Sequence, residues 1–250
     1  MEAFENFTAK AGNYAKYRPS YAEACLNYLA HEAGFAGKDI ADIGCGTGIF
    51  SRLLASFAKT VYAVEPNADM RSICQQECRT FANIRVSDGT AEHSQLPEQS
   101  VDSVTVAQAF HWFDAAKFRN ECRRILHPQG RVALVWNQLD WNGAILGGIR
   151  RLCADLGIEY IGFNSSLLKD DALFKEFFAS GEFVRKAFDN PLSFDREQFV
   201  GRYLSSSYSP KADDPRYPAY VQGLRDLFEQ HRQGDNVTMP YQTLSFLGAV

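Results

Sequence analysis

The stretch that most constrains the fold is residues 38–50, which read K-D-I-A-D-I-G-C-G-T-G-I-F. A short apolar run ends in three glycines at alternate positions, Gly44, Gly46 and Gly48, and passes directly into an apolar pattern with helical spacing. This order predicts a strand, a tight turn and a helix. Because glycine has no Cβ, the backbone of such a turn can adopt positive φ and approach a ligand closely, with the N–H groups of the helix start facing it.

The glycine spacing argues against two familiar ligand-binding loops. A dinucleotide motif, G-x-G-x-x-G, would need glycine at positions 44, 46 and 49, but position 49 is Ile49. A P-loop would need Gly-Lys-Ser or Gly-Lys-Thr to follow, and no such sequence does. What remains is D-x-G-x-G-x-G beginning at Asp42, a loop whose backbone is expected to approach a nucleoside-like ligand.

Strand and helix patterns alternate on either side of this loop. Apolar runs predict strands at 40–43, 60–64, 84–86, 101–107 and 131–136, and helical spacing predicts helices at 20–33, 50–58, 67–78 and 114–125. The first helix has a capping-box pattern formed by Ser20 and Glu23. Such alternation predicts an α/β fold with a mostly parallel sheet and right-handed crossovers.

The pattern becomes less regular after residue 136. Helices are expected at 144–156, 171–178, 195–204 and 217–231, and strands at 183–188 and 241–250. A turn-rich segment, S-S-S-Y-S-P-K-A-D-D-P, separates the last two helices. At 250 residues the chain has room for one α/β core and a modest addition.

Composition narrows the class of partner. The formal net charge is −4 and no long basic run occurs, which disfavours a nucleic-acid or anionic membrane surface and favours a small-molecule substrate. No apolar run reaches about 18 residues, so a cytoplasmic protein is expected. The six cysteines are scattered, which predicts neither a metal site nor a disulfide framework; Cys74 and Cys78 are interpreted as two thiols on one helix face.

Two carboxylates stand at predicted strand ends. Glu65 follows the second strand, where a carboxylate can accept hydrogen bonds from both hydroxyls of a ribose. NAD and S-adenosylmethionine (SAM) sites share this feature, so Glu65 predicts a nucleoside cofactor without choosing one. Asp42 ends the first strand, where it could face the ligand or only steady the turn.

Four segments in the same order resemble the class I SAM-dependent methyltransferases, and most of all the type 11 family, which includes UbiE-like and trans-aconitate methyltransferase-like enzymes. They are the glycine loop, S-D-G-T-A-E-H-S-Q-L-P at 87–97, Q-A-F-H-W-F-D at 108–114 and R-I-L-H-P-Q-G-R-V-A-L-V-W-N at 124–137. The resemblance covers about residues 4–140. It implies a Rossmann-like, seven-stranded, mostly parallel sheet with helices on both faces and an antiparallel C-terminal edge. It also implies a core of 1–194 and 236–250 and a small helical cap at 195–235 over the substrate.

The resemblance implies SAM as cofactor and S-adenosylhomocysteine (SAH) as its product. The cofactor would be bound by Asp42, Gly44, Cys45, Gly46, Gly48, Glu65, Pro66, Asp88, Thr90, Ala91 and Gln108. One position departs from the family pattern, because Thr90 stands where the adenine-binding acid is usual. Either Asp88, or Thr90 together with the amide of Ala91, could hold the adenine.

Aromatic residues near the site are candidates for substrate contact. The leader 1–19 is expected to fold as a lid, with Tyr14, Tyr17 and Arg18 near the site, or to form an arm that only covers apolar surface. His111 could be a general base, because histidine exchanges a proton near neutral pH, or it could be a structural partner of Trp112.

The expected reaction is an in-line transfer of methyl to an O, N, S or C nucleophile of a small molecule, with a carboxylate among the possible acceptors. A dedicated base is optional, because positioning the reactants supplies much of the catalysis. A monomer or homodimer is expected. Two other hypotheses are a nicotinamide-dependent oxidoreductase and a catalytically silent SAM-binding or interaction protein.

Overall fold

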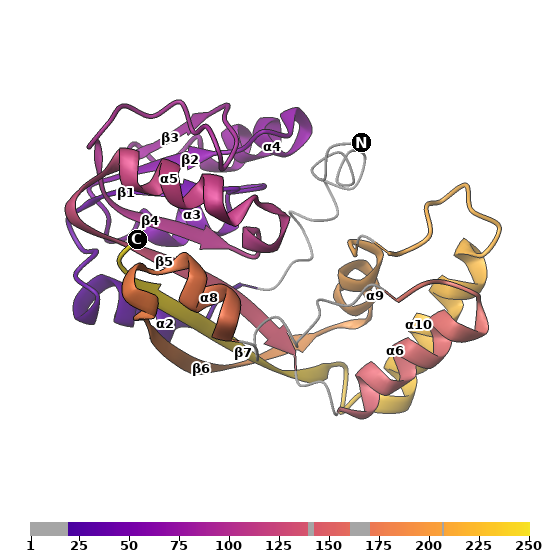
Figure 1. The fold of residues 1–250 in the computed structure, drawn as a ribbon. Helices are drawn as coiled ribbons and strands as arrows, with labels where there is room; N and C mark the ends of the chain where they lie inside the picture. Colours follow the sequence, from indigo (N-terminus) through magenta and orange to yellow (C-terminus); the bar gives the residue numbers. More distant parts are fainter. Residues whose placement is uncertain (1–19, 140–142, 161–170, 207) are drawn as a thin grey trace.

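A computed structural model describes residues 20–139, 143–160, 171–206 and 208–250. Its centre is a seven-stranded sheet in the order β3-β2-β1-β4-β5-β7-β6 (Figure 1). Strands β1 to β5 are parallel, and β7 runs antiparallel to both β5 and β6. The predicted fold class is therefore confirmed. The strands are β1 (Asp39–Ile43), β2 (Thr60–Val64), β3 (Ile84–Ser87), β4 (Val101–Ala107), β5 (Leu126–Leu139), β6 (Val184–Phe194) and β7 (Val237–Gly248).

Helices cover both faces of the sheet. One face packs against α2 (Glu23–Asn27), the π-helical turn η2 (Tyr28–Glu32), α3 (Ile49–Leu54) and α4 (Ala68–Cys78). The other face packs against the short helix η3 (Phe110–Trp112), α5 (Ala115–Ile125) and α8 (Asp171–Phe177), which the turn η4 (Ala179–Gly181) follows. Because both faces are covered, the central strand β4 is buried along most of its length rather than alternating between buried and exposed residues.

Aromatic rings fill the core beneath α5 and α8. The rings of Phe174 and Phe246 stack with centroids 4.1 Å apart, and Trp136 meets Phe246 edge-on at 5.7 Å. Such pairs contribute roughly 0.5–1.5 kcal/mol each beyond the burial of their area. They fix the antiparallel strand β7 against β5, and this holds the C-terminal segment to the core.

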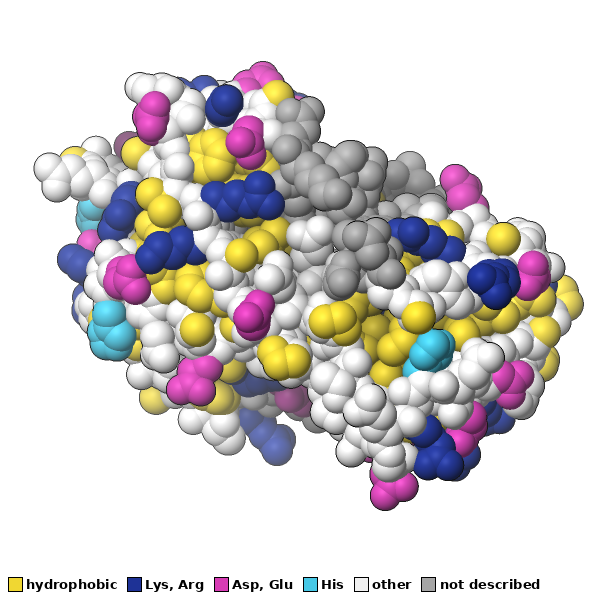
Figure 2. Space-filling model, turned by 90° about the horizontal axis from the view of Figure 1, so that it is seen from below, with side chains coloured by type: hydrophobic (Ala, Val, Ile, Leu, Met, Phe, Trp, Pro, Cys, Tyr) yellow, Lys and Arg dark blue, Asp and Glu magenta, His cyan; other side chains and the backbone are white. Residues whose placement is uncertain are grey.

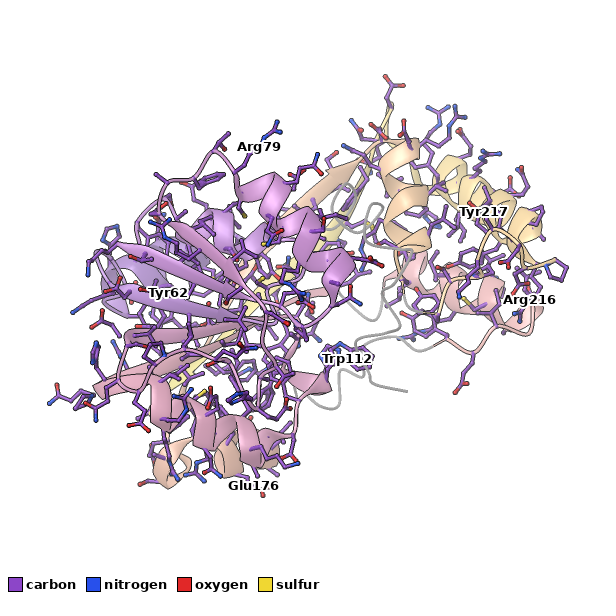
Figure 3. All side chains as sticks on the ribbon, turned by 90° about the horizontal axis from the view of Figure 1, so that it is seen from above. Tyr62, Arg79, Trp112, Glu176, Arg216 and Tyr217 are labelled. Atoms are coloured by element: carbon purple, nitrogen blue, oxygen red, sulfur yellow. The ribbon has the colours of Figure 1, made fainter. Side chains whose placement is uncertain are left out.

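A second lobe of helices stands beside the sheet (Figures 1 and 3). It comprises α6 (Ala144–Asp155), α9 (Arg196–Leu204) and α10 (Tyr217–His231), which share a hydrophobic cluster separate from the two cores of the sheet. We call these three helices the cap helices. The predicted cap range, 195–235, contains α9 and α10, and α6 packs against α10 as well. The division into a core and a cap over the substrate stays a prediction.

Strands β6 and β7 connect the sheet to the cap helices. Pairing of β5 with β7 ends at Leu139 and Tyr241, whereas β6 and β7 continue as a two-stranded ribbon to Phe194 and Val237. The outer residues of this ribbon are buried in the same cluster as the cap helices. Tyr241 therefore lies at the junction between the sheet and the cap helices.

The predicted start of the first helix is wrong. The helix begins at Glu23, after Ala22, and no side chain caps it. The carbonyl of Ser20 accepts hydrogen bonds from the side-chain amides of Asn137 and Asn190 at 2.8 and 2.9 Å. These long-range contacts hold Ser20 outside the helix, so its local capping signal is overridden.

The surface seen from below carries Lys, Arg, Asp and Glu side chains interspersed with one another (Figure 2). That face offers no single-sign field of the kind that steers a polyanion. Within the described ranges, no helix combines the length and the apolar character needed to cross a membrane.

Candidate active site

The glycine loop folds against the end of β2. The backbone N–H groups of Gly44 and Cys45 donate to the carbonyl of Val64 at 2.9 and 3.1 Å. The next N–H, that of Gly46, donates to Oε2 of Glu65 at 2.8 Å. The loop and the strand-end carboxylate therefore form one hydrogen-bonded unit, as expected for two elements that meet at the carboxyl edge of a parallel sheet.

The three loop glycines all have positive φ, but each meets different surroundings. A Cβ on Gly44 would lie 2.9 Å from the Cβ of Ala109, and a Cβ on Gly48 would lie 2.7 Å from Sγ of Cys74. A Cβ on Gly46 would have no atom of the described residues within 4 Å. Gly44 and Gly48 thus permit close packing inside the protein, whereas Gly46 borders open space that a ligand can occupy.

Glu65 is only 6% exposed. Besides the Gly46 bond, its Oε1 accepts the backbone N–H of Asn67 at 2.9 Å. Burial raises the pKa of this carboxyl, and the two backbone N–H donors lower it less, so the net pKa is raised. Each carboxylate oxygen has capacity for a further donor, such as a hydroxyl group. The neighbouring Pro66 directs its carbonyl to Arg71.

Asp42 lies behind the loop and is fully buried. Its carboxyl accepts hydrogen bonds from the hydroxyls of Ser51 at 2.6 Å and Thr105 at 3.0 Å. Burial raises its pKa to about 6. The side chain therefore ties β1 to α3 and β4, as the interpretation that it steadies the turn requires, and its role in cofactor binding stays a prediction.

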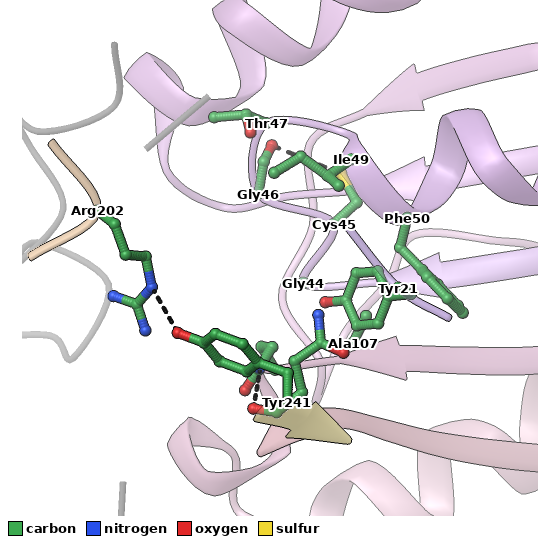
Figure 4. A pocket seen from close by; sticks show the side chains of 12 residues that line it. Tyr21, Gly44, Cys45, Gly46, Thr47, Ile49, Phe50, Ala107, Arg202 and Tyr241 are labelled. Atoms are coloured by element: carbon green, nitrogen blue, oxygen red, sulfur yellow. Dashed lines mark hydrogen bonds between the residues drawn. The ribbon is translucent and has the colours of Figure 1, made fainter. Parts of the chain in front are cut away.

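A cavity opens in front of the loop, between the carboxyl edge of the sheet and the cap helices (Figure 4). Its walls come from the glycine loop, the ends of β4, β5 and β7, the segment before α2, and α9. The lining residues are Tyr21, Gly44, Cys45, Gly46, Thr47, Ile49, Phe50, Ala107, Gln108, Asn137, Arg202 and Tyr241. Four predicted cofactor residues, three in the loop and Gln108, thus meet at one cavity.

Gln108 has a strained backbone. Its φ is 61°, in the left-handed region that a non-glycine residue rarely adopts. The side-chain amide donates to the carbonyl of Asn137 at 3.0 Å. Backbone strain of this kind is concentrated at functional sites, and here it places a polar side chain at the cavity wall.

The sequence reasoning did not single out three further lining residues. Asn137 accepts the hydroxyl of Thr243 at 2.6 Å, while Tyr241 and Arg202 come from the cap side of the cavity. In the sequence, Asn137 is the last residue of the segment 124–137, and Tyr241 is the first residue of the strand expected at 241–250. One feature of the sequence could have pointed to Arg202. It is a cation directly before Tyr203, a residue on the buried face of α9.

The loop after β3 stands apart from these cavity walls. Asp88 is 61% exposed and pairs with Arg71 at 3.1 Å. The hydroxyl of Thr90 accepts the backbone N–H of His93 at 3.1 Å, and Ala91 is buried. None of Asp88, Thr90 and Ala91 is among the lining residues, so both hypotheses for adenine binding stay predictions.

His111 and Trp112 belong to η3 and are not among the residues that line the cavity. Their ring centroids are 4.8 Å apart, and Trp112 is 39% exposed. Figure 3 shows Trp112 at the edge of the core that faces the cap helices. The two roles proposed for His111 stay open. The lid candidates Tyr14, Tyr17 and Arg18 lie outside the described residues.

Three thiols form a chain beside the loop. Sγ of Cys45 lies 3.8 Å from Sγ of Cys74, which lies 3.8 Å from Sγ of Cys78. All six cysteines are free. In the part of the chain that the structure describes, no group of His, Cys, Asp and Glu side chains could hold a metal ion.

Comparison with known proteins supplies the family. Residues 41–134 match the model of a methyltransferase domain. An uncharacterized methyltransferase of Mycobacterium tuberculosis is 30% identical over 243 residues, which is 96% of this chain and 93% of that protein. A probable S-adenosylmethionine-dependent methyltransferase of Saccharomyces cerevisiae is 29% identical over 52% of this chain and 46% of its own length.

Solved structures agree on the fold. A protein from Anaeromyxobacter dehalogenans described as a type II methyltransferase superposes with a TM-score of 0.65 and 22% identity, over 93% of this chain and 98% of that one. The cavity lies at the carboxyl edge of the sheet, beside a glycine loop whose spacing is not that of a dinucleotide motif. This chain belongs to the type 11 family of SAM-dependent methyltransferases.

Proposed function

We propose that this enzyme transfers the methyl group of SAM to a small-molecule acceptor held in the cavity between the glycine loop and the cap helices. The observation that carries this proposal is the open space at Gly46 beside the buried carboxylate of Glu65. The glycine loop forms one wall, and Tyr241 and Arg202 form the opposite wall. Glu65 is not itself a lining residue but is hydrogen-bonded to Gly46, which is one. A cofactor and an acceptor can therefore lie face to face.

The surroundings of Gly46 and Glu65 fit a nucleoside cofactor. Glu65 would accept the ribose hydroxyls, for which its two oxygens retain capacity. The backbone at Gly44, Cys45 and Gly46 would lie along the cofactor, since no side chain in the described ranges fills the space beside Gly46. Gln108 would face the methionine part, and the loop after β3 would hold the adenine through Asp88 or through Thr90 and Ala91.

When bound, SAM supplies a methyl group on a sulfonium ion that is already a good leaving group. The protein's task is to align the acceptor with that methyl and to exclude water. Alignment of this kind supplies roughly 7–11 kcal/mol in favourable cases. The acceptor atom is O, N, S or C, and His111 is the candidate base for an acceptor that must lose a proton.

Isothermal titration calorimetry with SAM, SAH and NAD tests the cofactor assignment. We expect binding of SAM and SAH and none of NAD; NAD binding without SAM binding would reverse the assignment in favour of the oxidoreductase hypothesis. Release of SAH in the presence of a metabolite panel, followed by mass spectrometry, distinguishes an enzyme from a silent SAM-binding protein. The cytoplasmic location and the monomeric or homodimeric state stay predictions.

A further inference from the structure

Arg202 carries the only charged side chain among the residues described as lining the cavity. It extends from α9 toward Tyr241, across the cavity from the glycine loop (Figure 4). Its Nε donates to the hydroxyl of Tyr241 at 3.3 Å, and its Nη1 donates to Oγ of Ser206 at 3.3 Å. The third nitrogen, Nη2, donates to no atom of the described residues.

No carboxylate neutralises Arg202 within the described ranges, where its contacts are hydroxyl groups and the ring of Tyr203. Other arginines of the same lobe do have acidic partners, as Arg196 has in Glu229 and Arg216 has in Asp214. A guanidinium that is partly removed from water and lacks a counter-charge is costly to maintain. Its position at the cavity wall indicates that the counter-charge comes from a ligand.

The phenols around Arg202 do not supply that charge. Burial raises the pKa of Tyr160, Tyr203 and Tyr208, so these side chains are neutral at physiological pH. A second cation, Arg150, lies over the ring of Tyr160 with its Cζ 5.9 Å from the centroid. At the cavity wall itself, Arg202 and Tyr241 combine a positive charge with a hydroxyl donor, which is the surface that a carboxylate requires.

We propose that Arg202 binds a carboxylate group of the methyl acceptor, so that the acceptor is a small organic acid. The inference rests on the proposed function and adds the class of its substrate. Nη2 of Arg202 would donate to one carboxylate oxygen. The hydroxyl of Tyr241 accepts from Nε, which leaves its own hydrogen free to donate to the other oxygen.

The location of this pair explains how an acid would be oriented. Tyr241 begins the part of β7 that pairs with both β5 and β6, so its position is fixed by the sheet. Arg202 is fixed by α9, whose N-terminus is closed by a capping box between Asp195 and Gln198. An acid anchored at Arg202 and Tyr241 would extend across the cavity toward the glycine loop.

The test uses a defined mixture with two halves. One half contains small carboxylic acids, such as succinate, fumarate, citrate, benzoate and phenylacetate, and the other half contains their primary amides. SAH release is measured for the full-length enzyme with each half of the mixture. We expect turnover of at least one acid and preference for it over its amide. Arg202→Gln should raise KM for that acid roughly 10- to 100-fold, which is the effect of losing a charge-assisted hydrogen bond.

Two comparisons separate recognition from structural damage. Arg196→Gln, on the same helix but at the surface, should leave turnover unchanged, and Arg202→Lys should retain part of the acid preference. Arg202→Gln should bind SAH as tightly as the wild type and should lose preference for the acid over the amide. Turnover confined to amides, equal turnover of acids by Arg202→Gln and wild type, or no turnover of any acid would each overturn the inference. Failure of the proposed function itself would differ, because the wild type would then either not bind SAH or release no SAH with any acceptor, including amines, phenols and thiols added to the panel.

Discussion

The backbone N–H of Gly46 donates a hydrogen bond to the carboxylate of Glu65 across 2.8 Å. One residue turns the loop after β1, and the other ends β2. Their bond fixes how far the Glu65 carboxylate lies from the open space at Gly46. Because a second backbone donor, from Asn67, holds the other oxygen, the carboxylate has a single orientation.

Removal of the Glu65 carboxylate should weaken cofactor binding. We expect Glu65→Ala to lower SAM affinity by about 1–3 kcal/mol, since hydrogen bonds to a charged group are lost. Glu65→Gln should also weaken binding, because an amide replaces one of the two acceptor oxygens by an NH₂ donor and so cannot accept from both Gly46 and Asn67. Asp69→Ala, at an exposed acid of α4, is the matched control. Calorimetry with unchanged SAM affinity in both Glu65 variants would remove Glu65 from the site.

The buried Asp42 should give stability a distinct pH dependence. Its pKa is about 6 in the folded protein and 3.8 ordinarily, so the folded state retains the proton at higher pH. Its contribution to stability is complete below about pH 4 and is lost as pH rises through about 6. Relative to wild type, Asp42→Asn should gain up to about 3 kcal/mol between pH 4 and 7, because one pKa unit corresponds to about 1.36 kcal/mol. Urea unfolding at several pH values measures this. A difference in unfolding free energy between the two proteins that stays constant from pH 4 to 7 would contradict the burial of Asp42.

Glu121 should show the opposite dependence. Burial raises the pKa of its carboxyl, but the Arg124 guanidinium and the N–H and hydroxyl of Ser94 lower it more, to about 2. Its stabilisation is therefore present above about pH 4.5 and lost as pH falls through about 2. We expect Glu121→Gln to cost roughly 1–3 kcal/mol at pH 7, with a smaller loss near pH 3. Denaturant titrations at both pH values measure this. An equal loss at the two pH values would show that the charge is not what stabilises the loop at Ser94.

His111 provides a test of acid–base catalysis. Its ring lies against Trp112 and away from the cavity lining, which favours a structural role. We expect His111→Ala to retain the pH profile of kcat/KM, with activity lowered less than about 10-fold. A general base would instead contribute about 100-fold or more, and its removal would abolish one limb of the profile. His93→Ala, an exposed histidine, is the control.

Much of the fold could be predicted because its signals are local. Strand β2 and helix α10 have the boundaries expected from apolar spacing alone, and the order of strands and helices gives the parallel part of the sheet. The start of α2 could not be predicted, because Ser20 is held by Asn137 and Asn190, which lie far away in sequence.

The same distinction applies to the site. The glycine loop, Glu65 and Gln108 were identified because each stands at a strand end with a recognisable neighbourhood. Arg202 and Tyr241 were not, because their proximity depends on how far β6 and β7 extend beyond β5. No local pattern encodes that length. The acceptor side of the cavity is thus a property of tertiary structure.

The most direct test of the account compares two glycines. Gly46 and Gly37 have φ of 58° and 70°, and a Cβ on either would have no atom within 4 Å among the residues that the structure describes. Asparagine tolerates this backbone region, so Gly46→Asn and Gly37→Asn should both fold. Gly37 precedes β1 at the end opposite the glycine loop, whereas Gly46 borders the proposed cofactor.

The measurement is SAM affinity by calorimetry for both variants, with melting temperatures recorded alongside. We predict that Gly37→Asn binds SAM like the wild type, and that Gly46→Asn keeps a similar melting temperature but loses measurable SAM binding. Wild-type affinity in Gly46→Asn would contradict the placement of the cofactor over the glycine loop.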